Sequence, residues 1–318
     1  MTSKPFPPID ITHLNTYSLN DRESKVTPAD FGKPWERGGS FAQFINSLPN
    51  ILGAGDLRAV IDALVTAYRT DKTVLFGMGA HVIKVGLNPL VIDLMRRGVI
   101  SAVAMNGAGI IHDFEIAYAA KTSEDVSATL GSGRFGMARE TGQYLSEAVR
   151  LAADEQTGLG TAVGRMINRH HFPHREKSIL SEADRLGIPV TVHIAMGTDI
   201  LHMHPDFDPA AAGEASHRDF RQFAAVVANL SEGVYLNVGS AVILPEVFLK
   251  ALTLARNLGH DVSGFTSVNM DFIRHYRPMT NVVGRPTAGS GRGISLVGQH
   301  EILLPLIAAG VIEQIDTP

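Results

Sequence analysis

Short apolar runs alternate along this chain with longer segments whose apolar residues recur at helical spacing. The runs at 73–76, 99–104, 190–194, 233–238 and 264–268 are mostly apolar, which is typical of parallel strands covered on both faces. The intervening segments predict helices at 41–45, 56–69, 87–97, 112–120, 138–154, 174–186, 216–229, 245–257 and 301–309. This alternation predicts an α/β fold with a central parallel sheet flanked by helices, of Rossmann-like topology.

The beginning of the chain lacks this alternation. Residues 1–35 contain Pro5, Pro7, Pro8, Pro28 and Pro34 and have no periodic apolar pattern, so we expect an irregular N-terminal arm over 1–35. No internal repeat or linker interrupts the remainder. We therefore expect a single domain over 36–318.

The composition limits the classes of function. Hydrophobic residues make up 45% of the chain and charged residues 19%, as in an ordinary globular protein with a sizeable core. The net charge of −4 gives no basic surface for nucleic acid. The absence of cysteine excludes disulfides and thiolate chemistry. With neither a signal peptide nor a membrane-length apolar stretch, we expect a cytoplasmic protein that binds no membrane.

Two strand ends carry glycine-rich turns. The first contains Gly77 and Gly79, and the second is Asn106-Gly107-Ala108-Gly109. Glycine lets a backbone turn sharply and approach a ligand, and ligands of parallel sheets bind at the carboxyl ends of the strands. We therefore expect a dinucleotide at these turns, although Val82 replaces the third glycine of the usual fingerprint. The alternative is that these are ordinary turn and cap residues.

Histidines suggest two kinds of chemistry. His112, next to Asp113 at the second turn, suits proton transfer near neutral pH, although Asp113 equally fits a helix cap. His202 and His204 form an H-x-H pair that follows Asp199. With further ligands such as His193, this pair could hold zinc or iron; the alternative is a set of hydrogen-bonded histidines without a metal.

Several stretches between residues 38 and 310 resemble, in order, segments of the deoxyhypusine synthase family. Asn106–Asp113 resembles that family's Thr-Ala-Gly-Gly-Val-Glu-Glu-Asp segment, and Gly197–His204 resembles its Gly-Asp-Met-Ile-Phe-Phe-His segment. Gly239-Ser240-Ala241-Val242-Ile243 resembles a glycine-rich strand end of the family. The family consists of NAD-dependent enzymes that transfer an aminobutyl group from spermidine to a lysine of a translation factor.

The resemblance implies NAD as cofactor, a homotetramer, and roles for individual residues. Asp199 would hold a cationic amine, since a carboxylate pairs well with an ammonium group in a sheltered site. His112 or His204 would move protons. The residues expected to line the cofactor are Gly77, Gly79, Asn106, Gly107, Ala108, Gly109, Gly239 and Ser240.

The chain also departs from the family pattern. The position of the family's imine-forming lysine is Leu244 or, in another alignment, Glu246, and neither can act as an amine nucleophile. Lys250 lies one turn beyond, where a solvated helix charge is expected. The family's paired glutamates are Ile111 and His112 here.

We therefore predict an NAD-dependent transferase or oxidoreductase that acts on a small amine or polar metabolite, rather than deoxyhypusine synthesis itself. No metal is assigned in this interpretation. The alternatives are a metal-dependent hydrolase that uses the pair His202 and His204, and a ligand-binding relative without catalysis.

Overall fold

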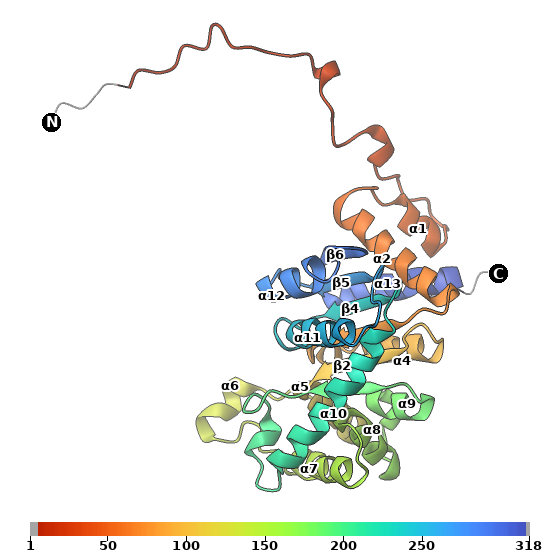
Figure 1. The fold of residues 1–318 in the computed structure, drawn as a ribbon, viewed down its shortest axis with the longest axis vertical. Helices are drawn as coiled ribbons and strands as arrows, with labels where there is room; N and C mark the ends of the chain where they lie inside the picture. Colours follow the sequence, from red (N-terminus) through yellow and green to blue (C-terminus); the bar gives the residue numbers. More distant parts are fainter. Residues whose placement is uncertain (1–5, 316–318) are drawn as a thin grey trace, which may run out of the picture.

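Six parallel strands form one sheet in the computed structural model, which describes residues 6–315 (Figure 1). Their order across the sheet is β3-β2-β1-β4-β5-β6, the order of a doubly wound dinucleotide-binding fold. The strands are β1 (Val74–Met78), β2 (Ala102–Asn106), β3 (Val190–His193), β4 (Val234–Val238), β5 (Thr266–Asp271) and β6 (Arg292–Val297).

Helices connect and cover the strands. They are α1 (Phe41–Ser47), α2 (Leu52–Arg69), α3 (His81–Lys84), α4 (Asn88–Arg96), α5 (Gly107–Ala119), α6 (Val126–Thr129), α7 (Arg139–Asp154), α8 (Leu159–Arg169), α9 (Ile179–Leu186), α10 (Pro209–Ala228), α11 (Ile243–Asn257), α12 (Tyr276–Pro278) and α13 (His300–Ile315). A π-helical segment, η6 (Met279–Gly284), follows α12, and a 3-10 turn, η5 (Ile200–Met203), follows β3.

The predicted α/β class with a flanked parallel sheet is confirmed. Several elements differ from the sequence prediction. β6 and α8 were not expected, and α5 begins at Gly107 rather than near residue 112. The earlier start of α5 matters most, because it places the second glycine turn inside the first turn of a helix.

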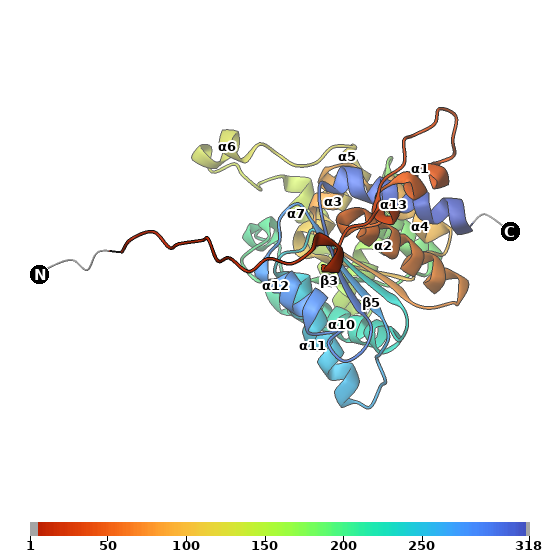
Figure 2. The same cartoon turned by 90° about the horizontal axis from the view of Figure 1, so that it is seen from above.

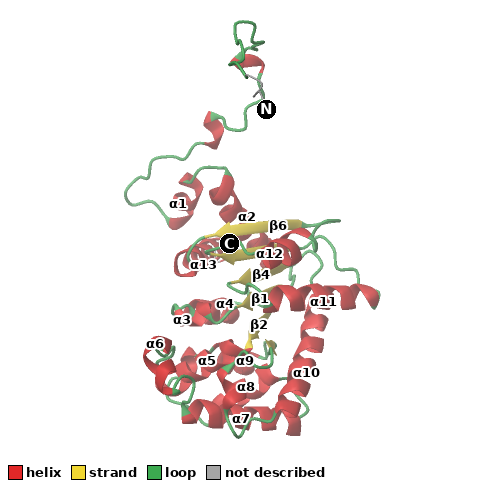
Figure 3. Cartoon of the chain, turned by 90° about the vertical axis from the view of Figure 1, so that its left-hand side faces the viewer, coloured by secondary structure: helices red, strands yellow, loops and turns green. Residues whose placement is uncertain are grey.

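The sheet has two covered faces (Figure 3). Phe76 and Met78 of β1 join the core built with α2, α4 and α13. Leu75 of β1 and Tyr235 of β4 face the opposite layer, where Phe223 of α10 and other apolar residues of α10 and α11 pack. Burial on both faces explains why these strands read as continuous apolar runs.

The order of the chain reverses between β1 and β4. Met78 is in register with Met105 of β2 on one side and with Val238 of β4 on the other. Beyond Met78, the N–H of Gly79 donates to the Val238 carbonyl at 2.9 Å. A ligand of such a sheet binds in the crevice at this reversal point, so the fold places the predicted glycine turns at one edge of the sheet.

The N-terminal part of the described chain extends away from the body (Figure 1). It contains only two 3-10 turns before α1, and apolar side chains such as Phe6 and Ile9 are exposed. The segment around α6 also projects from the body (Figure 2). No helix within residues 6–315 combines the length and apolar character that a transmembrane segment needs.

Candidate functional site at the start of helix α5

A cavity of about 220 Å³ runs along the first turns of α5. The N-cap residue Asn106 accepts a hydrogen bond from the Gly109 N–H through its side-chain oxygen, at 3.2 Å, and so starts the helix directly at the end of β2. Positions three, four and seven residues apart share one face of a helix. The residues of α5 that line the cavity follow this spacing: Ala108, Ile111, His112 and Glu115.

Three other parts of the chain complete the wall. Lys84 comes from the end of α3, and Thr198–Ile200 come from the loop after β3 and the start of η5. Ser123–Glu124, Val126 and Phe135 belong to the segment between α5 and α7. The cavity therefore gathers residues that follow strands β1, β2 and β3, at the carboxyl edge of the sheet.

Asp199 holds an unusual carboxylate. Its Oδ2 atom is buried and has no hydrogen-bond partner within residues 6–315. This oxygen lies against Gly107, where a Cβ atom would stand only 2.0 Å from it. Burial raises the pKa of the Asp199 carboxyl, with His202 and a hydrogen bond from Thr198 acting in the opposite direction. A buried oxygen without a donor is costly, which marks Asp199 as a place for a ligand's N–H or ammonium group.

His112 is held from one side of its ring. Its Nδ1 atom lies 2.6 Å from the Thr122 hydroxyl oxygen, and that hydroxyl donates to Glu115 Oε2 at 2.5 Å. Burial, assisted by the positive charge of Lys84, lowers the pKa of His112 to about 4. The imidazole is therefore neutral at physiological pH, and one ring nitrogen has a lone pair that can accept a hydrogen bond. The structure brings together two of the three predicted catalytic residues, His112 and Asp199.

Asp113, the neighbour of His112, has a structural role. It is fully buried and accepts hydrogen bonds from the Ser178 hydroxyl at 2.5 Å and from the Ile179 and Leu180 N–H groups at 2.9 and 3.1 Å. It thereby satisfies the start of α9, and burial raises its pKa to about 6. The expected role of Asp113 as the cap of its own helix is wrong, because Asn106 caps α5 and Asp113 lies within that helix.

His204, the third predicted catalytic residue, does not line this cavity. Its Nε2 atom lies 2.9 Å from the Gly136 carbonyl oxygen. Its ring fills the space beside Gly142 of α7, where a Cβ atom would stand 2.0 Å from Nδ1. The structure therefore gives His204 a packing role, fastening the segment before α7 to the loop after β3.

The histidines proposed as metal ligands are also separated. His202 accepts hydrogen bonds at Nδ1 from the N–H groups of Gly197 and Asp199, at 3.0 and 3.3 Å. His193 is buried on β3 with its ring edge against Phe223. Among residues 6–315, no group of three or more histidine or carboxylate side chains is placed to hold a metal ion. The geometry gives the metal-hydrolase alternative no support.

The predicted cofactor glycines sit where the backbone or a ring comes close. A Cβ on Gly77 would lie 2.9 Å from the Tyr235 ring, and one on Gly79 would lie 2.3 Å from the Gly239 carbonyl oxygen. The Gly109 position is closed by Met105. These glycines are required by internal packing, so their presence alone does not identify a cofactor site.

Gly239 and Ser240 form the turn after β4. Gly239 has a φ of +69°, and the His300 ring occupies the side where a Cβ would be. The Ser240 hydroxyl accepts a hydrogen bond from the Leu244 N–H at 3.2 Å, which satisfies one N–H at the start of α11. This turn and the start of α13 therefore meet at the crevice between β1 and β4.

Two observations at this edge fit a dinucleotide such as NAD. The buried Nδ1 atom of His300 and the buried Oδ1 atom of Asn237 lack hydrogen-bond partners within residues 6–315. The first N–H groups of α5, α11 and α13 have no partner within their own helices, and these helices begin directly after β2, β4 and β6. Helix starts of this kind favour phosphate groups. The 220 Å³ cavity itself is of substrate size, below the usual range for larger ligands.

The positions aligned with the family's lysine have no nucleophilic role. Leu244 is fully buried in the core under α11. Glu246 forms ion pairs with Lys250 and Arg277 and accepts a hydrogen bond from Asn281. The Lys250 side chain is 58% exposed, as expected of a solvated helix charge. Imine formation by these residues is not supported by the geometry.

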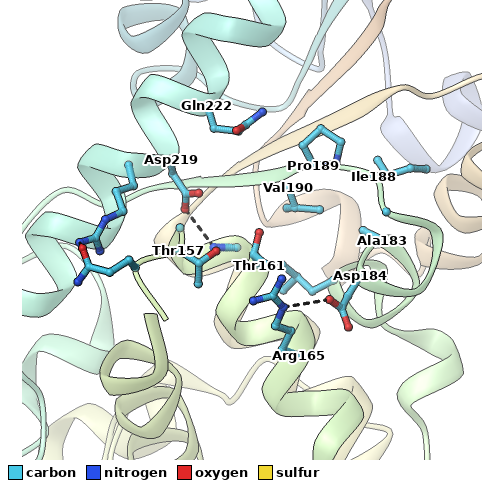
Figure 4. Close-up of a pocket in the computed structure, with 16 residues that line it drawn as sticks. Thr157, Thr161, Arg165, Ala183, Asp184, Ile188, Pro189, Val190, Asp219 and Gln222 are labelled. Atoms are coloured by element: carbon cyan, nitrogen blue, oxygen red, sulfur yellow. Dashed lines mark hydrogen bonds and ion pairs between the residues drawn. The ribbon is translucent and has the colours of Figure 1, made fainter. Parts of the chain in front are cut away.

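A second cavity, of about 510 Å³, lies at the amino end of β3 (Figure 4). Asp219 of α10 accepts hydrogen bonds there from the Gly160 and Val192 N–H groups, at 3.0 and 2.9 Å. Arg165 forms ion pairs with Glu155 and Asp184. Because these charged groups already have partners within the fold, we assign them a structural role.

Sequence reasoning missed Glu115, Thr122 and Lys84. The spacing of Ala108, His112 and Glu115 would have indicated Glu115 if the helix had been started at Gly107. Thr122 and Lys84 come from a loop and a short helix, where no periodic signal connects them to α5. Their place in the site follows only from the fold.

Comparison with protein-family models and with curated proteins finds no match for this chain. Solved structures do match. A protein provisionally described as a deoxyhypusine synthase, from Entamoeba histolytica, has a TM-score of 0.54 at 13% identity, covering 89% of this chain and 96% of its own. The arginine dihydrolase ArgZ of cyanobacteria has a TM-score of 0.54 at 16% identity, covering 82% of this chain.

AgrE in complex with ornithine and NAD⁺ has a TM-score of 0.51 at 13% identity, covering 85% of this chain. The present chain spans only about a third of the lengths of ArgZ and AgrE, 32% and 34% respectively. Likenesses at such identities concern the fold. They show that the fold is similar to that of a protein provisionally described as a deoxyhypusine synthase and to that of a protein crystallised with NAD⁺.

Proposed function

We propose that this protein binds NAD at the carboxyl edge of its sheet and oxidises a small cationic amine bound in the cavity along α5. The observation that carries the proposal is the convergence of His112 and Asp199 in that cavity. His112 supplies a neutral imidazole, and Asp199 supplies a buried carboxylate oxygen without a partner.

Asp199 would bind the substrate's ammonium group. Hydrogen bonds between charged groups in a sheltered site are shorter and stronger than neutral ones. An ammonium donor would satisfy the buried Oδ2 atom and favour the ionised carboxylate, whose pKa burial otherwise raises. Glu115 and Glu124 add acidic character to the wall and Lys84 opposes it, which favours a substrate with one compact cationic end.

His112 would relay to solvent the proton that an ammonium must lose before oxidation. In balance, R–CH₂–NH₃⁺ loses a proton through His112 to water, and the resulting amine loses a hydride to give R–CH=NH₂⁺. When bound, NAD⁺ would supply the acceptor for this hydride. Hydrolysis of the imine, or its attack by a second amine, would decide between an oxidoreductase and a transferase.

The cofactor would lie outside the cavity, over the turns that follow β1 and β4. The Gly239-Ser240 turn and the start of α13 would face it there, beside the edge-on rings of His81 and His300, whose centroids are 5.4 Å apart. The likeness to the AgrE fold, seen in complex with NAD⁺, supports this choice of cofactor. A homotetramer, as the deoxyhypusine synthase resemblance implies, belongs to the same proposal.

Calorimetric titration with NAD⁺ tests the first half of this proposal. We expect saturable heat at millimolar NAD⁺ or below. The second half is tested by NADH absorbance with a panel of aliphatic mono- and diamines, using Asp199→Asn as the inactive variant and Asp184→Asn, in the amino-end cavity, as the matched control. Absence of both heat and thermal stabilisation at millimolar NAD⁺ overturns the cofactor assignment.

A further inference from the structure

We propose that Thr122 and Glu115 are positioning residues that fix the proton of neutral His112 on Nδ1 and present its bare Nε2 to the cavity. This inference deepens the proposed function, and its value for catalysis rests on that function. The arrangement itself stands on hydrogen-bond geometry.

The direction of each hydrogen bond follows from the donors available. A carboxylate oxygen can only accept a hydrogen bond, and a threonine hydroxyl has one proton to donate. Glu115 accepts at both oxygens, from the Thr122 hydroxyl at 2.5 Å and from the Thr141 hydroxyl at 3.1 Å. The single proton of Thr122 is thus committed to Glu115.

The remaining contact of Thr122 then fixes the imidazole. Its oxygen lies 2.6 Å from His112 Nδ1, a distance that requires one proton between the two atoms. Since the hydroxyl proton points to Glu115, Nδ1 carries the proton and donates it to Thr122. The tautomer of a histidine is set by the bond that one ring nitrogen makes, so Nε2 keeps its lone pair.

Nε2 is free to act on a ligand. Within residues 6–315 it takes part in no hydrogen bond, and it is not among the buried atoms that lack a partner. Nε2 is therefore not fully buried, and His112 lines the cavity. The charged groups of the same wall are Lys84 of α3, Glu115 of α5, Glu124 of the following segment and Asp199 beside η5.

The chain of contacts also links the site to the projecting segment. Thr122 lies directly after α5 and before α6, and Glu124 accepts a hydrogen bond from the Gly136 N–H at 2.6 Å. Thr122 thus ties the start of this segment to α5, and Glu124 ties its start to Gly136 near its end. The position of this segment places the Thr122 hydroxyl against His112. The spacing of residues in the sequence does not indicate this contact.

Nitrogen-15 NMR of the ring nitrogens of the full-length, histidine-labelled protein tests this inference without any substrate. Loss of one set of signals in His112→Gln assigns the residue. We expect a single tautomer protonated at Nδ1 near pH 7. Thr122→Val should convert it to a mixture or to the Nε2-protonated form, whereas Thr122→Ser, which keeps the hydroxyl, should retain it.

Protonation at Nε2 in the unchanged protein, or an unaltered tautomer in a folded Thr122→Val, overturns the inference. Thermal unfolding and circular dichroism of both variants establish that they fold. If Thr122→Val does not fold, the spectrum of the unchanged protein still decides the tautomer. A protein with the expected tautomer that binds no NAD⁺ would contradict the proposed function and leave the positioning role intact.

Discussion

Two cavities lie at opposite ends of β3, and both contain a buried aspartate next to a helix start. In the amino-end cavity, Asp219 accepts hydrogen bonds from the N–H groups of Gly160 and Val192. In the carboxyl-end cavity, Oδ2 of Asp199 has no donor within the described residues. The Asp219 carboxylate stabilises the fold through these hydrogen bonds, whereas Oδ2 of Asp199 is available to a ligand. Cavity size alone would have favoured the amino end.

The amino-end arrangement also protects the edge of the sheet. β3 is an edge strand, and an unpaired edge exposes backbone groups that invite association. Asp219 and Ser216 of α10 bind the outward N–H groups of Val192 and Ile194, and Ser216 also donates to the Val192 carbonyl. Asp219 therefore joins α8, α10 and β3.

The largest expected effect is on stability, from Asp219→Ala. The substitution leaves the N–H groups of Gly160 and Val192 buried without an acceptor, which should cost about 3–5 kcal/mol of unfolding free energy. Chemical denaturation measures it. Asp219→Asn keeps one acceptor and should lose less. A loss below about 1 kcal/mol for the alanine variant would contradict the structural role.

The next effect concerns pH. The folded pKa of His112, about 4, lies below its ordinary value of 6.5, so between these values the unfolded chain binds more protons. The stability contribution of neutral His112 is present above pH 6.5 and is lost as the pH falls to 4. Relative to His112→Gln, the unchanged protein should lose up to about 3 kcal/mol between pH 7 and pH 4.

Parallel denaturation curves of the two proteins at both pH values measure this difference. Comparing the variant with the unchanged protein removes the opposite contributions of Asp113 and Asp219, whose folded pKa values are raised to about 6 and about 7. A constant difference across the range would show that His112 is not held neutral by its surroundings.

Gly107→Ala should affect binding rather than stability. The new Cβ would stand 2.0 Å from Asp199 Oδ2, and the carboxylate must move aside. Amine binding in the presence of NAD⁺ should weaken at least about tenfold, with unfolding free energy within about 1 kcal/mol, since alanine suits a helix. Gly213→Ala on α10, where a Cβ meets open space, is the matched control. Unchanged amine binding in Gly107→Ala would contradict the assignment of Asp199 as the residue that binds the amine.

The smallest effect is expected at the amino-end cavity from Arg165→Gln. Its ion pairs with Glu155 and Asp184 are partly exposed, and such pairs contribute about 0–1 kcal/mol. We expect a change within that range by denaturation and no thermal stabilisation of the unchanged protein by inorganic phosphate. Clear stabilisation by phosphate that Arg165→Gln abolishes would make this cavity an anion site.

The sequence predicts the fold class well because burial on both faces leaves a strong signal in the central strands. β6 lacks this signal because it is an edge strand whose residues alternate in exposure, from exposed Arg292 to buried Ile294 and Leu296. α8 is not predicted because Gly160 and Gly164 lower the helix propensity of this segment. These glycines allow contact with the backbone carbonyls of Val190 and Leu180, which only the assembled fold reveals.

The site is predicted in part for a similar reason. His112 and Asp199 follow strand ends, so topology alone indicates that they lie at one edge of the sheet. His204 follows the same strand as Asp199, but the chain turns through η5 and carries it against α7. A separation of five residues in a loop does not determine direction, whereas the same separation in a helix or strand would.

The most direct test is calorimetric titration of a small aliphatic diamine into the protein saturated with NAD⁺. Asp199→Asn and Asp184→Asn are measured in parallel, because they carry the same change in the two cavities. We predict that the unchanged protein and Asp184→Asn bind the amine with similar affinity, and that Asp199→Asn binds it at least about tenfold more weakly. Equal amine affinity in all three proteins, or loss of affinity only in Asp184→Asn, would contradict the assignment of the site to the cavity along α5.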